Sequence, residues 1–196
     1  AVMFLQEHAK ESPDKPLFLY VAYTTAHWPM HALPKDIAKY KGVYDGGFTK
    51  VRAARFKRLK KLGLIDKDLK ISAHSDEWEK TPNKEWDIRN MEVYAAMIDN
   101  MDQGIGRIVA EFERQGTLDN TLIFYLQDNG ACAEGFGRYK PNRPYRTDYK
   151  ALGRDGLQTK IWPPMQTRGG RPVKNGPDAM AGAEDTFTGV GRGWAN

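Results

Sequence analysis

One long amphipathic segment limits how this chain can fold more than any other feature. Apolar side chains recur along it at steps of three and four: Met91, Tyr94, Ile98, Met101, Ile105, Ile108 and Phe112. This spacing is typical of a helix that buries one face. We expect the helix to begin near Asp87 and to end around Gln115-Gly116, because glycine favours helix termination.

Two short apolar runs flank this helix and predict β-strands. Residues 17–23 and 121–126 are rich in aromatic and branched side chains, as in strands that are covered on both faces. A strand, a helix and a second strand in this order form a βαβ unit, with parallel strands and a right-handed crossover. The sequence therefore predicts an α/β fold.

Polar residues follow both predicted strands. Asp128-Asn129-Gly130 comes directly after the second strand, and His27 lies just past the first. Because ligands collect beyond the carboxyl ends of strands in open α/β sheets, we expect these residues along one edge of the sheet. Two adjacent oxygen-bearing side chains before a glycine can bind one hard cation. Asn-Gly is also a common turn dipeptide, so both interpretations stay open from this stretch alone.

The rest of the chain is less regular. Residues 1–11 fit the end of a helix, residues 35–86 form an excursion, and residues 136–196 are rich in glycine, proline and arginine without periodicity. We predict that residues 1–135 form part of a catalytic α/β domain and that 136–196 continue it irregularly. The chain lacks an initial Met and opens within a helix pattern, so we expect it to be a segment of a longer protein.

Basic side chains are concentrated in one stretch of a chain whose net charge is +5. They are Lys50, Arg52, Arg55, Lys57, Arg58, Lys60 and Lys61, with no acidic residue among them. Such a cluster can bind a polyanion. It can equally be the solvated face of a helix, with Val51, Leu59 and Leu62 facing inward. We favour the solvated face, because neither interleaved aromatic residues nor a nucleic-acid motif accompanies the charge.

Four stretches in a fixed order resemble the sulfatase family, specifically arylsulfatase-like enzymes of the alkaline-phosphatase superfamily. They are residues 16–23, 27–32, 91–102 and 118–130. The resemblance covers roughly residues 1–135 and implies an α/β sandwich with a mostly parallel central sheet flanked by helices, only partly represented here. It also implies hydrolysis of a small-molecule or carbohydrate sulfate ester, and a periplasmic or secreted location.

The resemblance assigns roles to three residues. Asp128 and Asn129 correspond to ligands of a calcium ion, and His27 corresponds to a histidine that contacts the sulfate or assists the leaving group. We interpret His31 as a residue that either supports these side chains or binds the substrate at the rim of the site. These roles are chemically reasonable, because a divalent cation stabilises charge on sulfuryl oxygens and an imidazole can donate a proton near neutral pH.

The departures from the family pattern concern the nucleophile. Sulfatases use a formylglycine made from the Cys of a Cys-x-Pro/Ser-x-Arg motif, whereas the single cysteine, Cys132, precedes Ala133-Glu134-Gly135-Phe136. We therefore predict that Cys132 is a small packing residue. The family's remaining calcium ligands and its later lysine also lie outside this chain. Two side chains cannot satisfy calcium, which takes six to eight oxygen ligands, so we expect this segment alone to be inactive.

Other functions are compatible with the same residues. A phosphodiesterase or phosphonate hydrolase of the same superfamily is the nearest alternative, and a non-catalytic polyanion-binding module is a more distant one. A sulfatase-like protein that has lost catalysis is a third. We expect no nucleic-acid partner. We also expect no membrane span, because no run approaches the roughly 20 apolar residues that a span requires.

Overall fold

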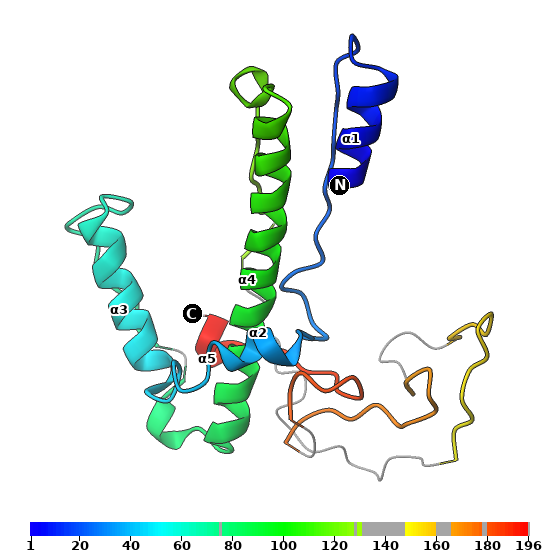
Figure 1. Cartoon of the computed structure of the whole chain (residues 1–196). Coiled ribbons are helices and arrows are strands. Elements are labelled where there is room, and N and C mark those ends of the chain that lie inside the picture. Colours follow the sequence, from blue (N-terminus) through cyan, green and yellow to red (C-terminus); the bar gives the residue numbers. More distant parts are fainter. Residues whose placement is uncertain (75, 128, 131–147, 160–165, 178–179, 196) are drawn as a thin grey trace. The chain divides into compact units, whose positions relative to one another are not determined.

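The computed structural model of the chain is drawn in Figure 1, and its contacts divide the chain into two compact units. It describes residues 1–74, 76–127, 129–130, 148–159, 166–177 and 180–195. The first unit comprises Ala1–Thr25 and Ile98–Gly130, and the second comprises Ala26–Met97 and Ala131–Asn196. The long helix passes from the second unit into the first, so each unit holds one half of it.

The predicted helices are present. The helical elements are α1 (Val2–Glu11), α2 (Pro34–Ala38), α3 (Gly47–Lys61), η1 (Trp78–Lys80), α4 (Lys84–Arg114), η2 (Leu118–Asn120) and α5 (Gly191–Ala195). Helix α4 confirms the long amphipathic helix, and Gly116, with a φ of 69°, follows its end as expected. No helix in the described part of the chain is long and apolar enough to span a membrane.

The two predicted strands do not pair with any described segment. Among the described residues only isolated bridges occur, Gln166 with Pro172 and Lys174 with Thr186. Side chains of the predicted strands are largely exposed, reaching 91% for Phe18 and 82% for Leu126. The parallel sheet therefore remains a prediction.

The first unit packs α1 and the run 17–23 against the C-terminal half of α4. Leu5 of α1 is 1% exposed, and the Gln6 amide donates a hydrogen bond to Glu111 at 3.3 Å. A Cβ atom on Gly104 would lie only 2.6 Å from the Tyr23 hydroxyl. Gly104 thus permits the close packing expected of a helix glycine, whereas a Cβ on Gly106 would meet open space.

The second unit has its own apolar core. It consists of Met30, Ile37, Val93, Ala96, Ala181 and Val190. Val93 and Ala96 are completely buried, whereas Met91 and Tyr94 of the predicted stripe are only partly buried. The buried face of α4 is therefore displaced from the stripe that the sequence pattern predicted, because α2 and the C-terminal segment contribute to the core as well.

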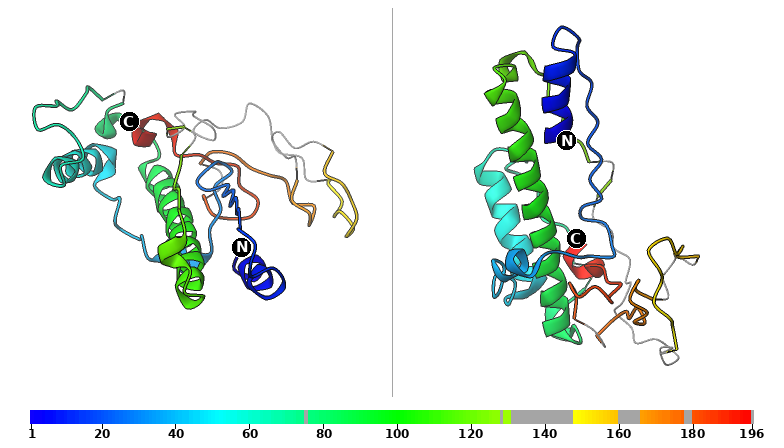
Figure 2. Two further views of the ribbon diagram at one scale, coloured as in Figure 1. Left: turned by 90° about the horizontal axis from the view of Figure 1, so that it is seen from above. Right: turned by 45° about the vertical axis from the view of Figure 1, so that its right-hand side comes forward.

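Helix α3, cyan in Figure 2, is held at its first turn by an aromatic cluster. The Phe48 ring lies 5.3 Å from the ring of Trp78 and 5.7 Å from that of Trp194. Gly47 has a φ of 75° and a Cβ there would lie 2.2 Å from Trp78, so only glycine fits. The expectation that Leu62 faces inward is wrong: it is 58% exposed, since the packing of α3 is concentrated at its N-terminal end.

Candidate functional site

The loop that carries both predicted site histidines is anchored by the side chains between them. Met30 is 1% exposed, and its amide donates a hydrogen bond to the Thr188 carbonyl at 3.2 Å. The Trp28 ring lies 5.2 Å from the Phe187 ring, and the Trp28–Pro29 peptide bond is cis. The loop is therefore built on residues from the far end of the chain.

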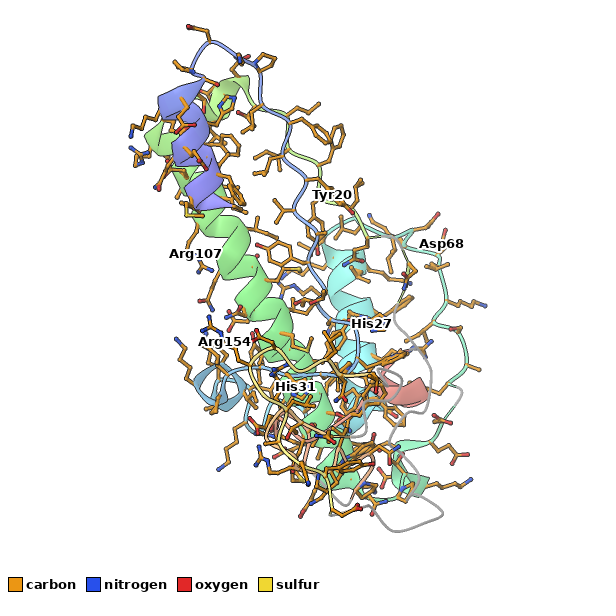
Figure 3. The ribbon with its side chains drawn as sticks, turned by 90° about the vertical axis from the view of Figure 1, so that its right-hand side faces the viewer. Tyr20, His27, His31, Asp68, Arg107 and Arg154 are labelled. Atoms are coloured by element: carbon orange, nitrogen blue, oxygen red, sulfur yellow. The ribbon has the colours of Figure 1, made fainter. Side chains whose placement is uncertain are left out.

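His27 is exposed at the start of this loop (Figure 3). Its Nδ1 lies 2.5 Å from the Trp28 carbonyl oxygen, and its ring centroid is 4.5 Å from that of Trp28. Because a carbonyl oxygen can only accept, Nδ1 must be the donor. In the neutral ring Nε2 is then the unprotonated nitrogen. In the charged ring Nε2 carries one proton, as Nδ1 does. Nε2 is thus the atom that can exchange a proton with a ligand.

His31 is exposed as a residue, but its ring is partly shielded from water at the other end of the loop. Desolvation lowers the pKa of His31, and hydrogen bonds with the backbone of Ala183 and Thr186 oppose that effect. These contacts tie His31 to the segment that also supports Met30. Its predicted role as a substrate-binding residue stays a prediction.

The predicted metal pair is only partly described. Asp128 lies outside the described residues, as does Cys132. Asn129 is exposed, and its amide nitrogen donates a hydrogen bond to the Gly130 carbonyl at 2.9 Å. The side-chain nitrogen of Asn129 is therefore engaged with Gly130. The amide oxygen is the atom of this side chain that suits a cation. Asn129 belongs to the first unit and His27 to the second, so their shared edge remains a prediction.

The described residues do not make a complete calcium site. They contain no group of three or more His, Cys, Asp or Glu side chains that could hold a metal ion. Asn129 supplies an oxygen of suitable chemistry, but calcium takes six to eight such ligands. A calcium ion at Asn129 therefore requires ligands beyond those that the structure describes.

Sequence reasoning missed the segment that supports the histidine loop. Residues 186–190 are all buried, and Thr188 is completely so. The run is too short to establish a helical or strand period. A brief alternation of threonine with apolar residues is its only local signal. Its role depends on contacts with residues 28–30, which no local pattern records.

Two arginines of the same region serve the local structure. The Arg168 guanidinium donates hydrogen bonds to the carbonyls of Gly153, Arg154 and Gly156. Arg171 forms an ion pair with Glu184. These contacts hold irregular backbone in place, so Arg168 and Arg171 are not free to act as receptors for an anionic substrate.

Comparison with known proteins places the chain among sulfatases. A family model described as "Sulfatase" matches residues 1–168. The arylsulfatase of Klebsiella aerogenes is 35% identical over 173 residues, which make up 83% of this chain and 37% of that protein. An uncharacterized sulfatase of Schizosaccharomyces pombe is 39% identical over 121 residues, or 58% of this chain and 22% of its own length. The chain thus spans little more than a third of the first relative and less of the second.

Proposed function

This chain belongs to the sulfatase family, and from that premise we propose that it forms part of an arylsulfatase-like sulfuric ester hydrolase. The observation that carries the proposal is the family match over residues 1–168, which includes the histidine loop and the Asp128-Asn129 pair. We further propose that the nucleophile, a formylglycine, is supplied by another part of a longer protein.

In this proposal His27 contacts the sulfate group or protonates the leaving group through Nε2. The contact between Nδ1 and the Trp28 carbonyl supports this role, because it orients the ring and leaves the other nitrogen for the ligand. The packing of Trp28 on Phe187 restrains the carbonyl that His27 uses. His31, tied to the backbone of Ala183 and Thr186, would bind the substrate beside it.

Asp128 and Asn129 would hold a calcium ion together with ligands from elsewhere in the longer protein. The hydrogen bond from the Asn129 amide nitrogen to Gly130 supports this assignment, since the oxygen of the same amide is the kind of ligand that calcium prefers. Bound there, the cation would stabilise negative charge that develops on the sulfuryl oxygens.

The predicted strands would belong to the central sheet of the same longer protein. Strongly exposed apolar side chains in both runs support this proposal: Phe18 is 91% exposed and Leu122 is 79% exposed. Runs of this composition are stable as strands when both faces are covered. Pairing with further strands would provide that cover and would complete an alkaline-phosphatase-like α/β sandwich.

Hydrolysis of 4-nitrophenyl sulfate by the longer protein tests the proposal. Replacing His27 with Ala should lower kcat by about 10²-fold or more, as expected for loss of a general acid. His8→Ala is the matched control, because His8 lies on α1 and has no proposed role. Turnover at the wild-type rate in His27→Ala would remove His27 from the mechanism.

A phosphodiesterase or phosphonate hydrolase remains the alternative to be tested in the same assay. The candidate residues would suit either anion, because both present several oxygens to a cation and an imidazole. Faster turnover of bis(4-nitrophenyl) phosphate than of 4-nitrophenyl sulfate would favour the alternative.

A further inference from the structure

Three lysines form a straight stripe along one face of α3. Lys50, Lys57 and Lys61 are spaced by seven and four residues, and at 3.6 residues per turn these positions return to the same side of a helix. All three are exposed. None of them forms an ion pair with a residue in the described part of the chain. We call these three residues the lysine stripe.

Other basic residues of α3 have structural tasks that the lysine stripe lacks. The Arg52 guanidinium donates hydrogen bonds to the Ser72 carbonyl at 2.8 Å and to its hydroxyl at 2.6 Å. The Lys60 ammonium donates to the Lys67 carbonyl at 2.6 Å and lies 4.9 Å from the centre of the Phe56 ring. The lysine stripe is therefore not needed to hold α3 in place.

The charge of the stripe is uncompensated within its own helix. No acidic residue occurs in α3, and Lys57 and Lys61 are four residues apart, a spacing at which like charges repel. Repulsion of this kind is relieved by a ligand that places negative groups along the helix axis. The stripe therefore fits an extended anionic chain better than a single small anion.

We propose that the lysine stripe of α3 (cyan in Figure 1) binds a linear polysulfated polymer. The choice of sulfate rests on the proposed function, because a sulfuric ester hydrolase meets substrates that carry sulfate groups. The stripe would hold part of such a chain that is not being hydrolysed, and would thereby raise affinity for polymeric over small sulfate esters.

Features of α3 argue against the other common polyanions. Single-stranded nucleic acids are held by several aromatic side chains on which bases stack, whereas in α3 Phe48 is buried and Phe56 lies beneath the Lys60 ammonium. Membrane-surface helices insert a broad apolar face. In α3 the apolar Phe48 is buried, and Val51 and Leu59 are already partly covered.

Binding of fluorescent dextran sulfate to the full chain tests the proposal. Replacing Lys50, Lys57 and Lys61 together with Gln should weaken binding at least tenfold. It should also reduce the slope of log affinity against log salt concentration by about 2, given roughly 0.7 per phosphate-like contact on a single strand. In the control variant Gln replaces Lys15, Lys35 and Lys41. These lysines are also exposed, and the substitutions remove the same amount of charge. It should bind like the wild type.

Further measurements separate the possible outcomes. Substitution of the stripe by Arg keeps the charge and should keep affinity, and circular dichroism should show unchanged helix content in every variant. Equal loss of binding in the stripe and control variants would overturn the proposal, as would tighter stripe-dependent binding to a DNA oligonucleotide or to phosphatidylserine vesicles. Stripe-dependent binding of dextran sulfate without turnover of 4-nitrophenyl sulfate by the longer protein would support the stripe and count against the proposed function.

Discussion

At the scale of single residues, Glu111 is the most strongly perturbed group in the described part of the chain. Hydrogen bonds from Arg114 and Gln115 lower the pKa of Glu111 from 4.5 to about 2, and a further bond from Gln6 of α1 acts in the same direction. The carboxylate thus connects α1 with the last turn of α4. The negative charge of Glu111 strengthens its hydrogen bonds with all three donors.

Stability should therefore depend on pH through Glu111. A pKa lowered on folding stabilises the native state fully above the unfolded value of 4.5, and this contribution is lost as pH falls toward about 2. Glu111→Gln should lower the unfolding temperature at neutral pH, and its deficit relative to wild type should shrink across that window. Thermal unfolding followed by circular dichroism measures both effects.

Glu113 provides the control for this comparison, because it is exposed on the same turn of α4. Glu113→Gln should leave the unfolding temperature nearly unchanged at every pH. A constant deficit for Glu111→Gln from neutral pH down to pH 2 would mean that its charge is unimportant.

At the scale of elements, α4 carries two glycines with different surroundings. Gly104 faces the Tyr23 hydroxyl, whereas Gly106 faces open space. Glycine in a helix interior costs about 1 kcal/mol relative to alanine. The helix tolerates this cost at Gly104 because the run 17–23 passes close to it, and no contact of this kind explains Gly106.

Alanine substitutions at these two positions should differ in their effect on the free energy of unfolding. Gly106→Ala should stabilise the protein by up to about 1 kcal/mol through helix propensity alone. Gly104→Ala should gain less or destabilise, because its methyl group would displace the Tyr23 ring. Urea unfolding of both variants measures the order, and a larger gain at Gly104 would show that Tyr23 does not pack there.

The elements also show which parts of the structure could be predicted from the sequence. Helix α4 was predictable because its apolar spacing and its terminal glycine are local signals. The identity of its deepest residues was not, since Val93 and Ala96 are buried by Ile37 and Ala181, which are distant in the chain. The motif predicts His27 as a site residue, and that role stays a prediction. The support of its loop by Phe187 and Thr188 depends on tertiary contacts that no short pattern contains.

At the scale of the whole molecule, the runs 17–23 and 121–126 differ from the covered strands of an α/β domain, because most of their apolar side chains are exposed. Apolar strands require partners for their backbone amides as well as cover for their side chains. The relatives of this chain are far longer than the part that it matches, and in our proposal the remaining partners come from a longer protein of that kind.

Hydrogen exchange of the two runs tests this interpretation. Amides of residues 18–22 and 122–126 should exchange rapidly in the isolated chain and at least a hundredfold more slowly in the longer protein. Amides in the middle of α4 serve as the internal control, because their helical hydrogen bonds exist in either case. Equal exchange in both proteins would contradict the proposed sheet.

The support of the histidine loop by the segment 186–190 has a consequence for the order of folding. The Met30 amide finds its carbonyl partner on Thr188, and Trp28 packs on Phe187. During synthesis the ribosome releases His27 long before these residues exist, so the loop must wait until residues 186–190 have been made before it takes its final conformation. Closing so long a loop is slow, because its entropy must be lost before the contacts form. The histidine loop would therefore reach its conformation late in folding, after α4 has formed from its local contacts.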